Sequence, residues 1–198
     1  MRMISTFISV PHEGQAGPTS RFANNSTRPS NYRKLENEPP DHAIGRSRGG
    51  LTTKIHAFTD ALVRPVALVL TAGQSGDNPQ LEPLLDLYRR QQHSLGDFTV
   101  LADKAYSHPS TRMKLRRRRI KHVIPERSDQ KQHRKNKGQQ GGRPPGFDRD
   151  LYKKRNTVER GFARFKQWRA IATRYDKYAI TYRGGALLAA TILHFKPI

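Results

Sequence analysis

The middle of the chain carries short apolar segments whose patterns predict a sheet. From Leu51 to Phe58, apolar and polar positions alternate with a period of two, as in a strand with one buried face. Residues 66–70 form a continuous apolar run, which is typical of a strand in the interior of a sheet. Two further apolar runs lie at 98–102 and 120–124. These four segments are predicted strands.

Segments with the periodicity of helices lie between the predicted strands and after them. An amphipathic helix is predicted from apolar residues at i, i+3, i+4 and i+7, which are Leu81, Leu84, Leu85 and Tyr88. Further helices are predicted over 107–118, 150–169 and 186–195, and residues 126–148 read as a polar, Gly-rich loop. Because strands and helices alternate, the sequence predicts an α/β fold with a mixed sheet flanked by helices.

The ends of the chain differ in character. Residues 1–43 are rich in Ser, Asn and Pro and predict a disordered or poorly packed tail, so that the folded domain spans residues 44–198. No apolar run reaches the roughly 18 residues of a membrane span, and the N-terminus is a poor secretion signal. We therefore expect a cytoplasmic protein. The absence of Cys excludes disulfides and Cys-ligated zinc.

Charge narrows the choice of partner. The chain has 37 Lys and Arg against 16 Asp and Glu, a formal net charge of +21. Residues 111–170 alone hold 21 of the basic residues, with runs at 115–119 and 131–137. A solvated basic face is one explanation, but this density favours contacts with the phosphates of a nucleic-acid backbone, above all by Arg116, Arg117, Arg118 and Arg119.

Two acidic residues stand out in this basic setting. Asp103 directly follows a predicted buried strand, and Glu159 shares one face of a predicted helix with Tyr152, Arg155 and Lys166. Each has an ordinary alternative: Asp103 could cap the next turn, and Glu159 could form an exposed pair with Arg155. Brought together, the two carboxylates could hold Mg²⁺, which prefers oxygen ligands.

Several motifs resemble those of bacterial insertion-sequence transposases of the DDE type. They are GRSRGGLTTKIH (45–56), LTAGQSGDNPQ (70–80), VLADKAY (100–106), GGRPPGFD (141–148) and the pattern Y-x2-R-x3-E-x6-K from Tyr152 to Lys166. The resemblance covers about residues 41–195. It implies a ribonuclease-H-like catalytic domain that cleaves DNA at the transposon end and joins the freed 3′-OH to target DNA. It also implies Mg²⁺, with Mn²⁺ as a substitute, and a homo-oligomer on DNA.

The resemblance also assigns roles to residues. Three carboxylates, Asp-Asp-Glu, bind the metal ions in this family, and Asp103 and Glu159 match the second and third. Tyr152, Arg155 and Lys166 match signature positions that contact the transposon end. We add Lys104, which follows Asp103, to these DNA-binding candidates.

The first carboxylate of the family has no clear counterpart. It lies on the first strand of the sheet, and residues 1–40 show no apolar strand that ends in Asp. Asp41, Asp60 and Asp77 are weak substitutes, because Asp60 resembles a hairpin turn and Asp77 a helix cap. The N-terminal helical DNA-binding segment of the family is also missing. We therefore expect an N-terminally incomplete domain, either the second reading frame of an element whose upstream frame supplies the rest, or a decayed copy.

Three functions stay open at this point. The first is a DNA transposase that lacks its first catalytic Asp and is inactive or incomplete as this chain. The second is a non-catalytic DNA-binding remnant that acts as a regulator. The third is a basic nucleic-acid packaging or ribosome-associated protein, which would give Glu159 no role.

Overall fold

Three long strands form an antiparallel sheet with β3 in its middle. The computed structural model describes residues 2–11, 37–92 and 98–195. Strand β3 (Gly50–Asp60) pairs with β1 (Arg2–Pro11) along one edge and with β4 (Pro65–Ala72) along the other. The short strand β2 (Gly45–Ser47) forms a hairpin with the start of β3.

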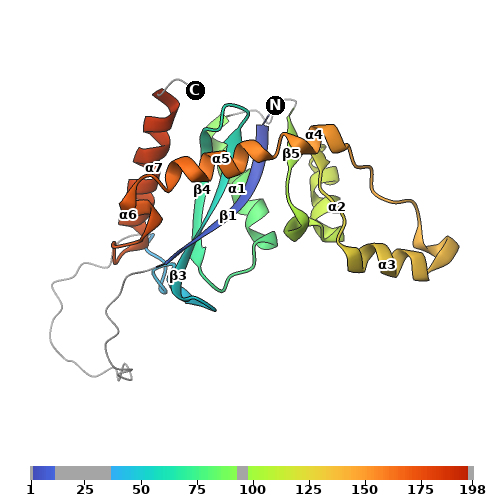
Figure 1. Cartoon of the computed structure of the whole chain (residues 1–198), viewed down its shortest axis with the longest axis horizontal. Helices are drawn as coiled ribbons and strands as arrows, with labels where there is room; N and C mark the ends of the chain where they lie inside the picture. The colour runs from blue at the N-terminus through green and yellow to red at the C-terminus, as the bar shows by residue number, and fades with distance from the viewer. Residues whose placement is uncertain (1, 12–36, 93–97, 196–198) are drawn as a thin grey trace.

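A parallel pair continues this sheet beyond β1. Strands β5 (Thr99–Leu101) and β6 (Lys121–Val123) pair in parallel, and β5 lies beside β1. The strands therefore follow the spatial order β4-β3-β1-β5-β6 (Figure 1). All four strands predicted from apolar runs are confirmed, and together they make the mixed α/β arrangement expected from the sequence.

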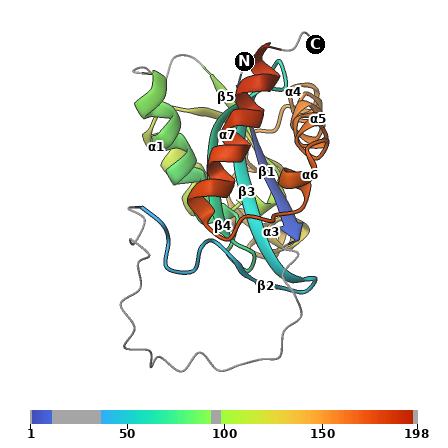
Figure 2. The same ribbon diagram turned by 90° about the vertical axis from the view of Figure 1, so that its left-hand side faces the viewer.

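Helices cover both faces of the sheet (Figure 2). On one face, α1 (Leu81–Gln92) and α2 (Pro109–Arg117) enclose a core that includes Leu84, Leu85 and Tyr88. These are residues of the predicted amphipathic stripe. On the other face, α5 (Asn156–Phe165), α6 (Arg169–Ala172) and α7 (Ala179–Phe195) enclose a second core. Within the described residues, no helix is both long and apolar enough to cross a bilayer.

The segment predicted as a loop contains a helix. Residues 126–148, which we call the basic arm, include α3 (Ser128–Asn136) and a 3-10 turn at Gly138–Gly141. The arm projects from the side of the molecule away from α7 (Figure 1). None of the α3 side chains is buried, so the helix has no apolar stripe for a sequence pattern to reveal.

The single long helix predicted over 150–169 is also wrong. The chain forms α4 (Arg149–Lys153), then α5 and α6. Between α4 and α5, the amides of Lys154 and Arg155 bond carbonyls three residues back. Asn156 and Thr157, which follow, have low helix propensity, and the Thr157 hydroxyl donates to the Lys154 carbonyl at 2.8 Å. The break therefore has a local cause.

The prediction of a tail over residues 1–43 is wrong for its two described segments, residues 2–11 and 37–43. Residues 2–11 form strand β1 instead, and residues 37–43 pack against the domain, with Ala43 only 3% exposed. Residues 12–36 lie outside the described residues. In β1 the β-branched residues Ile4, Thr6, Ile8 and Val10 occupy alternate positions, a strand pattern that the sequence analysis overlooked.

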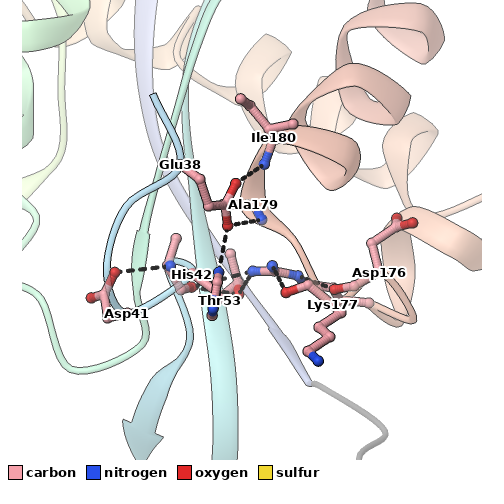
Figure 3. A network of polar contacts seen from close by, with 10 residues as sticks. Glu38, Asp41, His42, Thr53, Asp176, Lys177, Ala179 and Ile180 are labelled. Atoms are coloured by element: carbon pink, nitrogen blue, oxygen red, sulfur yellow. Dashed lines mark hydrogen bonds and ion pairs between the residues drawn. The ribbon is translucent and has the colours of Figure 1, made fainter. Parts of the chain in front are cut away.

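A buried arginine ties the C-terminal segment to β3 (Figure 3). Arg174 is 0% exposed, and its guanidinium donates to Thr53 Oγ1 at 2.6 Å and to the Ala43 carbonyl at 3.4 Å. It also donates to the backbone carbonyls of Asp176 and Lys177 at 2.9 and 3.1 Å. One side chain thus joins parts of the chain that lie more than a hundred residues apart in sequence.

Glu38 fixes the start of α7 in the same region (Figure 3). Its carboxylate accepts hydrogen bonds from the amides of Ala179 and Ile180 at 2.7 and 2.9 Å, and His42 Nδ1 lies 2.7 Å from it. A carboxylate at a helix N-terminus satisfies amides that have no partner within the helix. This cap explains why α7 begins at Ala179, seven residues before the predicted start.

Candidate functional site

Asp103 lies where the sequence places it, at the end of β5. Its side chain is partly buried, and one carboxylate oxygen accepts the Ala105 amide at 2.9 Å. Asp103 therefore caps the 3-10 turn at Lys104–Tyr106, as its alternative interpretation proposed. Capping engages one oxygen, so the position at the edge of the sheet remains compatible with a second role.

Glu159 lies on α5, which three apolar side chains hold against the sheet. Val158, Phe162 and Phe165 are buried in the core on this face. The Glu159 side chain is 60% exposed, and its Oε1 accepts from the Arg155 guanidinium at 2.6 Å. The exposed pair that the alternative interpretation expected is therefore present.

The pKa of Tyr152 is affected by both of these carboxylates. Burial raises the pKa of its hydroxyl, and the negative charges of Asp103 and Glu159 raise the pKa further. The Arg155 guanidinium, centred 5.6 Å from the ring centroid, opposes this rise. The charges of both carboxylates therefore act in the same direction on the Tyr152 hydroxyl.

The two lysines of the predicted site occupy its edges. Lys104 follows Asp103 and is exposed. Lys166 ends α5, seven residues after Glu159, and is exposed as well. Seven residues are about two helical turns, so Glu159 and Lys166 lie along the same side of the helix.

The first strand of the sheet is present, but it brings no carboxylate. Strand β1 lies between β3 and β5, in a segment where the sequence analysis expected a tail. Residues 2–11, however, contain no Asp, Glu or His. Among the described residues, no group of three His, Cys, Asp or Glu side chains is placed to hold a metal ion. The residues present therefore do not fit the three-carboxylate set that the resemblance implies.

The three substitute aspartates have other partners. Asp41 accepts the amide two residues later at 2.9 Å. Asp60 closes the hairpin after β3, where it accepts the amide and the guanidinium of Arg64. Asp77 precedes a 3-10 turn without a capping bond and pairs instead with Lys54 at 3.0 Å. None of the three joins Asp103 and Glu159.

The arginine run after α2 divides into two kinds of side chain. Arg118 Nη1 lies 2.7 Å from Asp86 Oδ1 on α1, and Glu82 is within 3.7 Å of the same guanidinium. Arg116, Arg117 and Arg119 are exposed. Arg118 thus holds α2 against α1, whereas the other three remain predicted DNA contacts.

A pocket next to α2 was missed by the sequence analysis. It has a volume of about 430 Å³, lies between α2 and the basic arm, and is lined in part by Arg112, Arg116, Lys137 and Arg143. A basic composition indicates how much charge is present, but it cannot show which cations share one cavity.

Comparisons with known proteins agree with the motifs. A family model described as "Transposase DDE domain" matches residues 5–193. A transposase described for insertion sequence element IS6501 of Brucella ovis is 31% identical over 143 residues, which are 72% of this chain and 98% of that relative. A chain in the crystal structure of the Mos1 strand transfer complex is 12% identical, with a TM-score of 0.37; the match covers 98% of this chain and about half (52%) of that one. This chain belongs to the family of transposase DDE domains.

Proposed function

We propose that this chain binds DNA as a transposase domain whose cleavage site is incomplete. The observation that carries this proposal is strand β1, which lies beside Asp103-bearing β5 but has no carboxylate of its own. Members of the family generally use divalent metal ions. Asp103 and Glu159 provide two of the three carboxylates that the family uses, so we derive no metal-dependent step for this chain.

The strand arrangement supports a ribonuclease-H-like assignment for the domain. Strands β4, β3 and β1 are antiparallel to their neighbours, whereas β5 and β6 are parallel. Asp103 lies at the carboxyl end of β5, and α5 carries Glu159 across the face of the same sheet. In this proposal, both carboxylates face one DNA phosphate at the edge of the sheet.

The charge distribution supports DNA as the partner. Arg116 and Arg117 lie in the last turn of α2 and Arg119 follows it; all three are exposed. The basic arm projects beyond α2 (Figure 1). Lys104, Tyr152, Arg155 and Lys166 surround the carboxylates, where they would position a transposon end. Contacts of this kind bind the phosphate backbone and weaken as salt rises. A protein that acts on the DNA of a bacterial element works in the cytoplasm.

Metal-dependent strand cleavage is the second candidate function. It is favoured by the match of Asp103 and Glu159 to the second and third carboxylates of the family, and the charges of both raise the pKa of Tyr152. Cleavage would need a ligand from beyond the described residues, or from a second copy of the chain. The two candidates differ in one measurable property, because only the second predicts broken DNA strands.

Nicking of supercoiled plasmid separates these functions. The purified chain is incubated with plasmid in Mg²⁺ or Mn²⁺ beside the variant Glu159→Gln, which keeps the size of the side chain and removes its charge. We expect both proteins to shift the plasmid in a gel and neither to nick it above background. Nicking by the unaltered chain that Glu159→Gln abolishes would contradict the proposal and establish a working metal site.

A further inference from the structure

The pocket between α2 and the basic arm concentrates positive charge in a confined space. Its volume is about 430 Å³, and its charged lining consists of Arg112, Arg116, Arg134, Lys137, Arg143 and Glu126. Five permanent cations thus face one carboxylate, and His133 adds a further nitrogen donor. A cavity lined in this way attracts an anion, since the cations repel one another until a negative charge enters.

The single carboxylate of this lining is already neutralised. Glu126 forms an ion pair with Arg134, and both side chains are largely buried. Arg112 is only 5% exposed and donates to the Ile124 carbonyl at 2.8 Å, so its position is fixed. Burial lowers the pKa of Arg112, with nearby Arg116 adding to that effect and Glu126 opposing it. Arg116, Lys137 and Arg143 are exposed and remain able to turn toward a ligand.

The fold shapes this pocket through a close backbone approach. Gly141 lies so near α3 that a Cβ at this position would be 2.2 Å from the Arg134 carbonyl oxygen. The chain therefore turns back onto α3, which places Arg143 on the same cavity as Arg134 and Lys137. Gln130 Nε2 donates to the Ser107 carbonyl at 3.2 Å and holds the arm to the body of the domain.

We propose that this pocket binds a backbone phosphate of DNA, at a site distinct from Asp103 and Glu159. The inference rests on the proposed function, because it assigns one phosphate of the same DNA. Ser107, which lines the pocket, follows Asp103 by four residues, a span of at most about 14 Å of chain. That length corresponds to roughly four base-pair steps of 3.4 Å. The Ser107 side of the pocket therefore lies within about four base-pair steps of Asp103.

Salt-dependent DNA binding tests this assignment. Fluorescence anisotropy with a labelled random duplex gives the slope of log K against log [KCl] for the full chain. Lys137→Ser/Arg143→Ser is expected to reduce the slope by about 2 and the affinity by about tenfold at 0.1 M KCl. The matched control is Arg89→Ser/Arg90→Ser, which removes two exposed charges from the last turn of α1, outside the pocket. An equal decrease in both variants would overturn the assignment to this pocket.

A second variant tests the shape of the pocket without changing its charge. Gly141→Ala forces the chain away from the Arg134 carbonyl and should reduce the slope by about 1, with circular dichroism checking that the domain still folds. An unchanged slope in this variant would mean that the pocket geometry is not used. Failure of the unaltered chain to bind any duplex would instead overturn the proposed function itself.

Competition with inorganic phosphate tests whether the pocket binds a phosphate of the DNA backbone or a free anion. If the pocket serves the DNA backbone, 10 mM phosphate should compete weakly with duplex for the unaltered chain, and the effect should vanish in Lys137→Ser/Arg143→Ser. Chloride at equal ionic strength is the control for screening. Thermal stabilisation by phosphate, combined with an unchanged DNA salt slope in the double variant, would assign the pocket to a free anion and overturn the proposal.

Discussion

Replacing Arg174 by Met is expected to lower the free energy of unfolding by about 3–5 kcal/mol. The guanidinium is 0% exposed, and it donates to Thr53 Oγ1 and to three backbone carbonyls. Met fills much of the same volume but cannot donate to Thr53 Oγ1 or to the carbonyls of Asp176 and Lys177, whereas the Ala43 carbonyl keeps the Thr53 hydroxyl as a donor at 2.6 Å. It also removes the cation that lies 5.1 Å from the Tyr182 ring centroid. Urea denaturation followed by circular dichroism measures the loss.

The control for this substitution is Arg183→Met on α7. Arg183 is exposed, so the same chemical change there should alter the free energy of unfolding by less than about 0.5 kcal/mol. The two variants differ in burial and in hydrogen bonding, not in the residue removed. Equal stabilities of Arg174→Met and Arg183→Met would mean that the network in Figure 3 does not hold the C-terminal segment.

Acid is expected to weaken the fold through His56, with a loss of about 3 kcal/mol between pH 7 and pH 4. His56 is 0% exposed, and its Nε2 lies 2.8 Å from Thr71 Oγ1. Burial lowers its pKa from 6.5 to about 4, while the charge of Asp77 acts in the opposite direction and that of Lys54 in the same direction. In the unfolded chain the imidazole takes up a proton below pH 6.5, but in the folded chain it resists protonation until about pH 4. Stability therefore falls across this interval as the pH decreases.

The variant His56→Gln isolates this contribution. Gln can still bond Thr71 but does not titrate, so its free energy of unfolding should fall about 3 kcal/mol less than that of the unaltered chain over the same interval. Parallel pH profiles for His56→Gln and the unaltered chain would show that His56 is protonated without cost.

Sequence patterns predicted the apolar framework of the fold because burial repeats with the period of each element. The stripe around Leu84 and the run at 66–70 are examples, and both segments form the expected elements. Helix α3 could not be predicted from an apolar pattern because none of its residues is buried. The break after Lys153 could not be predicted either, because it depends on local hydrogen bonds rather than on periodicity. Strand β1 has β-branched residues at alternate positions, but residues 1–43 as a whole are rich in Ser, Asn and Pro, a composition typical of a tail.

The candidate site was predictable only where a motif marks it. The motifs single out Asp103 and Glu159, and their role in one site stays a prediction. The partners of Arg118 were not predictable, because Asp86 lies 32 residues away on another helix. The burial of Arg174 was not predictable from the sequence either. No sequence pattern distinguishes it from an exposed arginine, because its partners are oxygen atoms that only the fold brings around it.

The network around Arg174 also has a consequence for synthesis on the ribosome. Thr53 and Ala43 emerge 121 and 131 residues before Arg174, and Glu38 emerges 141 residues before the Ala179 amide that it caps. A growing chain can therefore form the β3–β4 hairpin early, but it cannot close this network until its last segment has left the exit tunnel. We expect a nascent chain arrested before residue 174 to remain sensitive to protease, and a small delay in completing translation to prolong its dependence on chaperones.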